Sequence, residues 1–301
     1  MYHGIINVYK EAGFTSHDVV AKLRGILKQK KIGHTGTLDP DAVGVLPVCL
    51  GSGTKLCDML TDREKEYRTR MLLGKETDTQ DISGKTVKQQ EVKIGNQEAE
   101  AAILSFFGEY DQIPPMYSAI KVGGKKLYQL AREGKEIERR PRWVQILDLE
   151  IEKMEIPWIT MRIVCSKGTY IRTLCHDIGQ KLGCGGVMVS LERTRAGIFS
   201  IRDALLLAEI EELHREGKLT GKILPVDAVF SGYTSVTVRR EAQKLIDNGN
   251  AFYQDMVLER KKYIPEENVR VYNEDGRFYG IYQFRLEEER FWPVKMFMEN
   301  G

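Results

Sequence analysis

The sequence lacks the features that would assign a chain to a membrane, a secretory pathway or a zinc fold. It contains no run of about 18 apolar residues, so we expect no membrane-spanning helix. Its first residues, MYHGIINVYKEAG, lack the basic-then-apolar pattern of a signal peptide. The five cysteines form no CxxC or Cys/His cluster with the spacing of zinc ligands. These absences predict a cytoplasmic protein with reduced, mostly buried thiols.

Motifs for nucleotide binding and for common hydrolases are missing as well. The phosphate-loop pattern GxxxxGK(S/T) does not occur, because GSGTK at residues 51–55 has the wrong spacing. The same glycines fail the GxGxxG pattern, and the chain has neither a GxSxG elbow nor a kinase signature. His34 and Asp39 are five residues apart with no second histidine nearby, so we expect no metal site.

The chain as a whole also lacks a large excess of positive or negative charge, but one segment is strongly basic. The 301-residue chain has a formal net charge of +2, so its overall charge does not indicate a nucleic-acid partner. Residues 121–142, however, hold eight Lys or Arg and three Glu, with Tyr128 among them and Trp143 directly after. Such a run is either a solvated surface helix or a flexible arm that meets phosphates and bases.

Length and patterning predict two parts. At 301 residues the chain is long enough for two domains. An amphipathic helix is predicted near the N-terminus, with Ser16 as its N-cap and Val19 and Leu23 on its buried face. After about residue 235 the chain becomes rich in aromatic strands, with a hairpin turn at Asn273–Gly276. This change in composition and patterning predicts a small, mainly β module at the C-terminal end.

The stretch GHTGTLDP, residues 33–40, presents a single carboxylate between glycines and a proline. Pro40 drives the backbone of Asp39 toward an extended conformation, and Gly33 and Gly36 permit a close approach to a ligand. An Asp before Pro also serves in turns, where it hydrogen-bonds its own backbone. The residues alone leave a candidate site and a simple turn both open.

A second candidate lies in KGTYIRTLCHDIGQKLG, residues 167–183, which predicts a tight turn followed by a helix. Tyr170 and Arg172 fall in the first helical turn, off the apolar stripe. A guanidinium beside the free N–H groups of a helix start suits the binding of an anion. Both residues are equally typical of an ordinary helix surface.

Five long motifs, in order along residues 2 to about 230, resemble those of the TruB family of pseudouridine synthases. They read GHTGTLDPDAVGVLPVCLG, KEYRTRMLLGKETDTQDISG, PPMYSAIKVGGKKLYQLAREG, KGTYIRTLCHDIG and LERTRAGIF. The first resembles the catalytic motif of the family, and the third resembles its RNA-binding thumb. The C-terminal module resembles a PUA domain, with weaker motifs.

The resemblance implies a fold and an activity. The expected fold is α+β, in which a mixed, mainly antiparallel sheet forms a synthase domain over residues 1–232, with a thumb insertion at about 110–142. A mainly β, PUA-like RNA-binding domain is expected over residues 235–301. The implied reaction isomerises uridine to pseudouridine at position 55 in the T-loop of tRNA. It exchanges a C1′–N1 bond for a C1′–C5 bond, so no cofactor or metal is expected.

By motif position, the resemblance makes Asp39 the catalytic nucleophile and Tyr67 the ring that stacks on the target uracil. Arg172 matches the arginine that pairs with the catalytic carboxylate, and we expect it to lower the pKa of Asp39. Whether Asp39 attacks C1′, attacks the base or removes a sugar proton stays open.

Four further positions are implied to bind the substrate. His34 matches the histidine that takes the place of the flipped-out base, and Tyr170 and Leu191 match positions that line the base pocket. Lys10 aligns with a lysine of the first family motif. The family usually continues with proline there, whereas this chain has Glu11.

The resemblance also implies the partners. The thumb is expected to contact RNA through Lys121, Lys125, Lys126, Arg132, Arg139 and Arg140. We expect a monomer that binds the T-stem-loop of tRNA and needs no guide RNA or obligate protein partner. One alternative is a guide-RNA-dependent relative, which shares the motifs but lacks the thumb. The other is a non-catalytic tRNA chaperone with the same fold.

Overall fold

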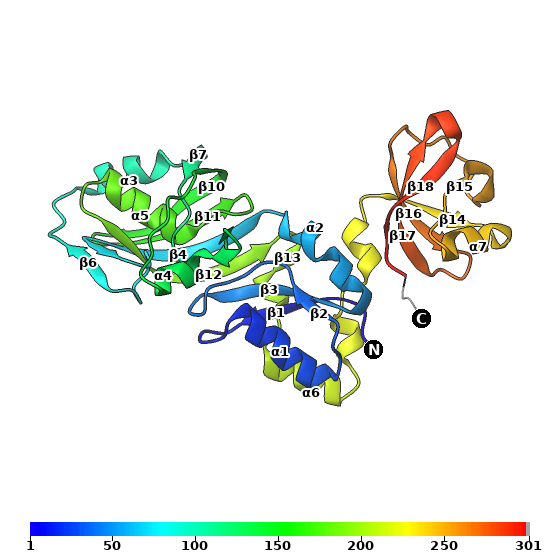
Figure 1. Ribbon diagram of the computed structural model, residues 1–301, viewed down its shortest axis with the longest axis horizontal. Coiled ribbons are helices and arrows are strands. Elements are labelled where there is room, and N and C mark those ends of the chain that lie inside the picture. The colour runs from blue at the N-terminus through cyan, green and yellow to red at the C-terminus, as the bar shows by residue number, and fades with distance from the viewer. Residues whose placement is uncertain (299–301) are drawn as a thin grey trace.

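A nine-stranded sheet runs through most of the chain (Figure 1). The computed structural model describes residues 1–298. The strand order is β1-β3-β12-β4-β11-β10-β7, with β2 paired to β3 and β13 paired to β12. The strands are β1 Gly4–Lys10, β2 Ile32–His34, β3 Val43–Leu50, β4 Lys65–Leu73, β7 Gly108–Gln112, β10 Arg142–Glu155, β11 Trp158–Cys165, β12 Gly186–Ala196 and β13 Phe199–Ser200. Among the strands of this sheet within residues 1–298, only β3 and β12 pair in parallel, so the expected mixed, mainly antiparallel α+β fold is confirmed.

Two groups of helices pack on this sheet and bury separate apolar cores. The helices of this part are α1 Ser16–Leu27, α2 Cys57–Thr61, α3 Asn96–Leu104, α4 Leu127–Arg132, α5 Ile171–Lys181 and α6 Leu207–Arg215. α3 and α5 pack on the central strands, where Met71, Ile103 and Leu174 are fully buried. α1 and α6 pack against β1 and β3 through Leu23 and Ile210. Among residues 1–298, no helix has the length and apolar character needed to cross a membrane.

The start of α1 differs from the prediction by one residue. Thr15 is the N-cap, because its hydroxyl accepts from the N–H of Asp18 while the Asp18 carboxylate accepts from the N–H of Thr15. The predicted cap, Ser16, is wrong for a physical reason. Its hydroxyl is fully buried and accepts a hydrogen bond of 2.9 Å from the N–H of Leu38, in the loop that carries Asp39.

Two short hairpins stand apart from the large sheet. β5 (Lys75–Thr77) pairs with β6 (Thr86–Gln89), and β8 (Lys121–Val122) pairs with β9 (Lys125–Lys126). α4 follows β9 directly, so the basic segment singled out in the sequence is a hairpin and a short helix.

A second sheet of five strands, ordered β14-β16-β17-β18-β15, forms the C-terminal part. Its elements are β14 Thr234–Val238, α7 Gln243–Asp247, β15 Phe252–Tyr253, β16 Asn268–Asn273, β17 Phe278–Arg285 and β18 Arg290–Met296. Aromatic rings dominate its core, as in the stacked pair of Phe252 and Phe291. The predicted hairpin turn is confirmed, since the N–H of Gly276 donates to the carbonyl of Asn273. The role of this module as a PUA-like RNA-binding domain stays a prediction.

One apolar cluster contains residues of both sheets and of the segments between them. Phe230, in a 3₁₀ turn just before β14, packs against the rings of Phe278 and Phe297 with centroid distances of 6.5 and 5.8 Å. Ile5 and Val45 of the large sheet belong to the same cluster. The C-terminal part is therefore held against the large sheet and is not merely tethered to it.

Candidate active site

The loop that carries Asp39 joins β2 to β3 and is fixed from within the protein. The N–H of Ala42 donates to the carbonyl of Asp39 at 3.1 Å, which closes a four-residue turn with Pro40 at its second position. The ammonium of Lys10 donates to the carbonyl of Pro40 at 2.9 Å. The side chain of Asp39 remains 39% exposed, so a ligand can reach the carboxylate. Asp39 is thus both a turn residue and an accessible acid.

Arg172 holds the Asp39 carboxylate in a bidentate ion pair. Its Nε lies 2.8 Å from Oδ2 and its Nη2 lies 3.1 Å from Oδ1. The guanidinium, only 5% exposed, also donates to the carbonyls of Thr79 at 3.0 Å and Tyr117 at 2.9 Å. Asp81 approaches it at 3.7 Å. One arginine therefore joins the Asp39 loop, the loop after β5 and the first part of the thumb.

The pKa of Asp39 is raised in spite of this ion pair. Burial raises the pKa of this carboxyl most, the Arg172 guanidinium lowers it, and the charge of Asp81 raises it further. Arg172 therefore acts in the predicted direction, but its effect does not outweigh burial. Once ionised, a carboxylate with a raised pKa is a better base and nucleophile than an ordinary one.

Two tyrosines from different elements lie close enough to Asp39 for its charge to affect them. Tyr67 lies on β4 among the buried residues of the central core, and Tyr170 is the N-cap residue of α5. Burial raises the pKa of each phenol, and the charge of Asp39 adds to both shifts. The structure thus brings Tyr67, Tyr170 and Arg172 together around Asp39.

Gln112 fixes the backbone of Tyr170. Its Oε1 accepts from the N–H of Tyr170 at 2.7 Å, and its Nε2 donates to the carbonyl of Tyr170 at 3.0 Å. The side-chain amide also contacts the hydroxyl of Tyr110. Gln112 is 1% exposed and ends β7, at the start of the thumb. It was not predicted, because nothing local marks a glutamine that binds a backbone 58 residues away.

β12 supplies a wall of the site through two residues on one face. Leu191 and Arg193 are two positions apart, so both side chains point to the buried side of the strand. Arg193 donates to the carbonyls of Val45 at 2.6 Å and Gly36 at 3.2 Å, and it opposes the rise in the pKa of Tyr67. Arg193 was not predicted either. The sequence feature that could have identified Arg193 is its place in the LERTRAGIF motif, two residues after Leu191.

His34 lies on β2, at the start of the Asp39 loop. Its Nδ1 accepts from the N–H of Gly36 at 3.3 Å, and its ring meets that of His17 edge-on at 5.3 Å. Burial lowers the pKa of His34 to about 4, with smaller contributions from the positive charges of His17 and Arg193. The imidazole is therefore neutral at physiological pH.

Lys10 lies beneath the loop and is fully buried. Its ammonium donates to the carbonyls of Glu11 at 3.0 Å, Phe14 at 2.6 Å and Pro40 at 2.9 Å. Burial lowers the pKa of Lys10 to about 8. Its contacts are with backbone, so its evident task is to hold the turn that presents Asp39.

The acidic residues of the site face an arginine and form no metal-binding group. Across residues 1–298, no cluster of three or more His, Cys, Asp or Glu side chains is arranged to hold a metal ion. Asp39 and Asp81 both approach Arg172. The chemistry that these side chains offer is that of a carboxylate, a guanidinium and two phenols.

Comparison with known protein families identifies the family of this chain. The family model described as "TruB family pseudouridylate synthase (N terminal domain)" matches residues 24–171, and the model described as "tRNA pseudouridylate synthase B C-terminal domain" matches residues 172–231. The chain belongs to the TruB family of pseudouridylate synthases. It is therefore an enzyme that isomerises uridine to pseudouridine. Asp39 falls within the first match and Arg172 within the second, so the ion pair joins the two.

Curated relatives resemble this TruB-family chain over nearly its whole length. A Lachnoclostridium phytofermentans protein named tRNA pseudouridine synthase B is 51% identical, with 98% of this chain and 100% of the relative covered. A protein of the same name from Alkaliphilus oremlandii is 46% identical, with 98% and 97% covered. Among solved structures, a chain of a Cbf5–Nop10–Gar1 complex matches with a TM-score of 0.72 at 26% identity, covering 98% of this chain and 85% of that chain.

The basic residues expected in the thumb of this TruB-family chain are of two kinds. Four are exposed: Lys121, Lys125, Arg132 and Arg140. Lys126 is half-buried, with its ammonium 5.6 Å from the centre of the Tyr128 ring. Arg139 is only 21% exposed and donates to the carbonyl of Pro114 at 3.2 Å. Arg139 therefore anchors the segment, whereas the four other residues are open to solvent, although Lys125 pairs with Glu133 at 3.3 Å.

Proposed function

We propose that this enzyme isomerises the uridine at position 55 in the T-loop of tRNA, with Asp39 as the nucleophile. The observation that carries the proposal is the bidentate pair of Asp39 and Arg172, at 2.8 and 3.1 Å, with the carboxylate still open to a ligand. The tRNA substrate is supported by the name of the relatives at 51% and 46% identity, tRNA pseudouridine synthase B.

The reaction breaks the C1′–N1 bond, rotates the uracil and forms a C1′–C5 bond, after which the C5 proton leaves to solvent. Asp39 starts the sequence by attack at C1′ or at the base, or by removing a sugar proton. Arg172 orients the carboxylate throughout. Tyr67 and Tyr170 hold the detached uracil, and their raised phenol pKa values keep both rings uncharged beside it. Leu191 lines the same pocket.

The target nucleotide has to leave its stack before Asp39 can reach it, at a cost of a few kcal/mol. The neutral ring of His34 fills the vacated place in the RNA loop and offsets part of that cost. Lys10 acts as a positioning residue, because its three hydrogen bonds hold the turn behind the nucleophile.

RNA contacts outside the pocket come from two regions. The exposed lysines and arginines of the thumb, residues 110–142 of a catalytic domain at 1–232, neutralise phosphates of the T-stem-loop. The C-terminal module, residues 235–301, recognises the shape of the tRNA as a PUA-like domain. The enzyme acts in the cytoplasm as a monomer, without cofactor, guide RNA or obligate protein partner.

The alternative with a specific observation in its favour is guide-RNA-dependent activity, because the fold matches chains of H/ACA particles with a TM-score of 0.72. Identity weighs against it. Those chains are 23% and 26% identical, against 51% for the relative named tRNA pseudouridine synthase B.

The test is release of tritium from a tRNA transcript labelled at uridine C5, without guide RNA or other protein. We expect the wild type to release tritium and Asp39→Asn to be slower by at least about 10⁴-fold, with tRNA binding retained. Asp41→Asn, an exposed carboxylate two residues away, is the matched control and should stay near wild type. A transcript with cytidine at position 55 should release none.

Each opposite result has a distinct meaning. Release by Asp39→Asn at the wild-type rate would remove Asp39 as the nucleophile. Failure of the wild type on the transcript alone would favour guide dependence or a chaperone role. Release from the cytidine transcript would move the target away from position 55.

A further inference from the structure

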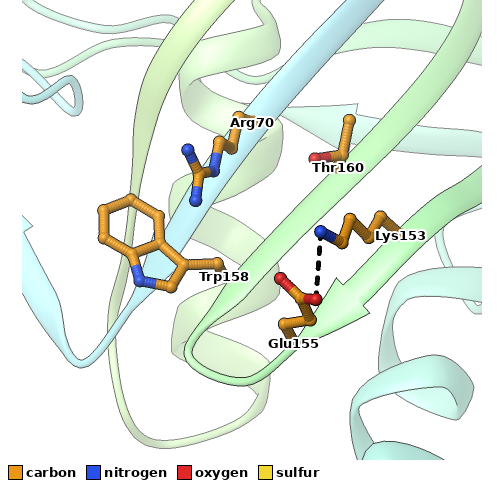
Figure 2. Close-up of a pocket in the computed structure, with 5 residues that line it drawn as sticks. All are labelled: Arg70, Lys153, Glu155, Trp158 and Thr160. Carbon is orange, nitrogen blue, oxygen red and sulfur yellow. Dashed lines mark ion pairs between the residues drawn. The ribbon is translucent and has the colours of Figure 1, made fainter.

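A pocket of about 210 Å³ lies on the large sheet, away from the active site (Figure 2). Its lining residues come from β4, β10 and β11: Arg70, Lys153, Glu155, Trp158 and Thr160. On β4, Tyr67 is buried whereas Arg70, an odd number of positions along, is exposed. Side chains alternate along a strand, so Arg70 points to the face opposite Tyr67. The pocket is therefore separate from the Asp39 site.

Strand register gathers hydrogen-bond donors into one row of this pocket. Arg70 on β4 lies opposite Thr160 on β11, and Thr160 lies opposite Lys153 on β10. A β-bulge between Ile151 and Lys153 sets the last pair. Without this extra residue Glu152 would face Thr160, so the bulge replaces an acidic side chain in the row with a basic one.

Arg70 differs from its neighbours on this face in having no carboxylate partner. Arg68 pairs with Glu152 at 2.5 Å, and Arg162 pairs with carboxylates of β10 at 2.7 and 2.8 Å. Within residues 1–298, no Asp or Glu forms an ion pair with Arg70. Its guanidinium instead lies 4.3 Å from the centre of the Trp158 ring. Figure 2 shows the two side chains next to each other. Stacking holds the guanidinium in place and leaves its N–H groups free to donate.

We propose that this pocket binds a phosphate group. The guanidinium of Arg70, the hydroxyl of Thr160 and the ammonium of Lys153 approach from three adjacent strands, which suits a tetrahedral oxyanion better than a flat carboxylate. The volume of about 210 Å³ is below the roughly 300–1,000 Å³ of pockets that enclose whole small molecules. The pocket therefore takes the phosphate itself, and the rest of its carrier lies outside.

Glu155 is the one acidic group in the lining, and its ion pair with Lys153 is weak. The two side chains are 3.0 Å apart but 63% and 64% exposed, so solvent screens their attraction. An incoming phosphate competes for Lys153, and Glu155 is free to turn into solvent. Arg70 and Lys153 together leave the lining with one excess positive charge.

The first experiment uses inorganic phosphate as the probe and contains no RNA, so it is independent of the proposed activity. The indole N–H signals of the full-length ¹⁵N-labelled protein are followed by NMR at constant ionic strength, and Trp158→Phe assigns the signal of interest. We expect a saturable shift of the Trp158 signal. Arg70→Gln should weaken phosphate binding by about tenfold or more.

Arg68→Gln is the matched control, since it removes the same charge from the same face of β4 at a position that is already paired. It should bind phosphate like the wild type. The remaining indole signals report whether each variant is folded. The proposal is overturned if the Trp158 signal of the wild type does not move, or if Arg70→Gln and Arg68→Gln bind phosphate equally well.

A second arm identifies the carrier of the phosphate by measuring tRNA binding at several salt concentrations. If the RNA backbone supplies the phosphate, Arg70→Gln should lower the slope of log K against log salt by about 1 relative to Arg68→Gln. Equal slopes, with phosphate binding intact in the first arm, assign the site to a free phosphate compound.

Discussion

At the scale of single residues, the charges around Asp39 give a prediction for the pH dependence of catalysis. In the proposed mechanism Asp39 acts in its ionised form, so kcat should fall as the pH falls through the pKa of this group. Burial and the charge of Asp81 raise that pKa. The acid limb of the pH–rate profile should therefore lie above pH 3.9, which is about the ordinary pKa of an aspartate. Asp81→Asn removes a charge that raises the pKa and should move the limb to lower pH. The measurement is the single-turnover rate constant, with enzyme in excess over tRNA, as a function of pH.

Asp41→Asn again serves as the control, and its acid limb should coincide with that of the wild type. An acid limb that stays in place or moves to higher pH in Asp81→Asn would show that Asp81 does not act on Asp39 through its charge.

Gln112 gives a second prediction at this scale. Gln112→Glu keeps the acceptor for the N–H of Tyr170 but turns the donor that meets the Tyr170 carbonyl into a second oxygen. The repulsion should shift Tyr170 and lower kcat by about 10- to 100-fold, with little change in KM. Gln89→Glu, at an exposed position of β6, should have no effect. A loss of thermal stability with unchanged kcat would make Gln112 a purely structural residue.

The residues that sequence reasoning found and those it did not find differ in a physical way. Asp39 and Arg172 stand in long motifs, so their meeting across 133 positions was expected from the family resemblance. Gln112 and Arg193 act through backbone carbonyls and N–H groups, which every residue has. Such interactions leave no local mark in the sequence. For Arg193 only its place in the LERTRAGIF motif could have pointed to a role, and for Gln112 the role becomes visible only when the fold brings the segments together. The raised pKa of Asp39 was not foreseen for a similar reason, since burial depends on the whole surroundings.

At the scale of elements, the thumb contains exposed basic residues, which we propose bind RNA, and a mostly buried arginine that holds the segment in place. Changing Lys121, Lys125 and Arg140 to Gln should weaken tRNA binding and flatten its salt dependence, by about 0.7–0.9 in slope for each phosphate that is no longer neutralised. The side chains are exposed, so thermal stability should change little. The measurement is Kd at several salt concentrations.

Arg139→Gln is the contrasting variant, because Arg139 is mostly buried and bonds the carbonyl of Pro114. It should affect the stability of the segment more than the salt slope. A triple variant whose slope equals that of the wild type would remove these residues from the RNA interface.

Sequence patterns predicted the types of the elements better than their ends and partners. The helix at α1 was predicted from its apolar spacing, but the cap was misplaced by one residue, because the Ser16 hydroxyl bonds the N–H of Leu38 instead. The bulge that brings Lys153 opposite Thr160 was not predicted either, since a bulge depends on how neighbouring strands register. The conformational propensities of a short segment do not predict which distant hydrogen-bond partner or strand register a residue adopts.

At the scale of the whole molecule, we expect the apolar cluster that joins the C-terminal module to the large sheet to couple stability to substrate binding. Phe230 is 3% exposed and packs on Phe278 and Phe297, so Phe230→Ala should cost about 3–5 kcal/mol in the free energy of unfolding. It should raise KM for full-length tRNA more than KM for a short T-stem-loop, because only the former reaches the C-terminal module. Both constants are measured by tritium release.

Phe107→Ala, at a ring that is 61% exposed, is the control and should leave stability and both KM values nearly unchanged. Equal increases of KM for the two substrates in Phe230→Ala would show that the C-terminal module does not contact the tRNA beyond the T-arm. The sequence predicted this module from its aromatic strands, but not how it docks, because the docking residues are ordinary core residues on both sides.

The position of Arg172 has a consequence for the order of events on the enzyme. The same guanidinium binds the carboxylate of Asp39, the carbonyl of Thr79 and the carbonyl of Tyr117 at the entrance to the thumb. A displacement of any of these segments alters the hydrogen bonds available to the other two. We therefore expect the alignment of Asp39 to depend on the placement of the segment around Tyr117. If Asp39 is the nucleophile and this segment binds RNA, as proposed above, a displaced segment leaves the carboxylate misaligned and slows the reaction on RNA that is held in the wrong register.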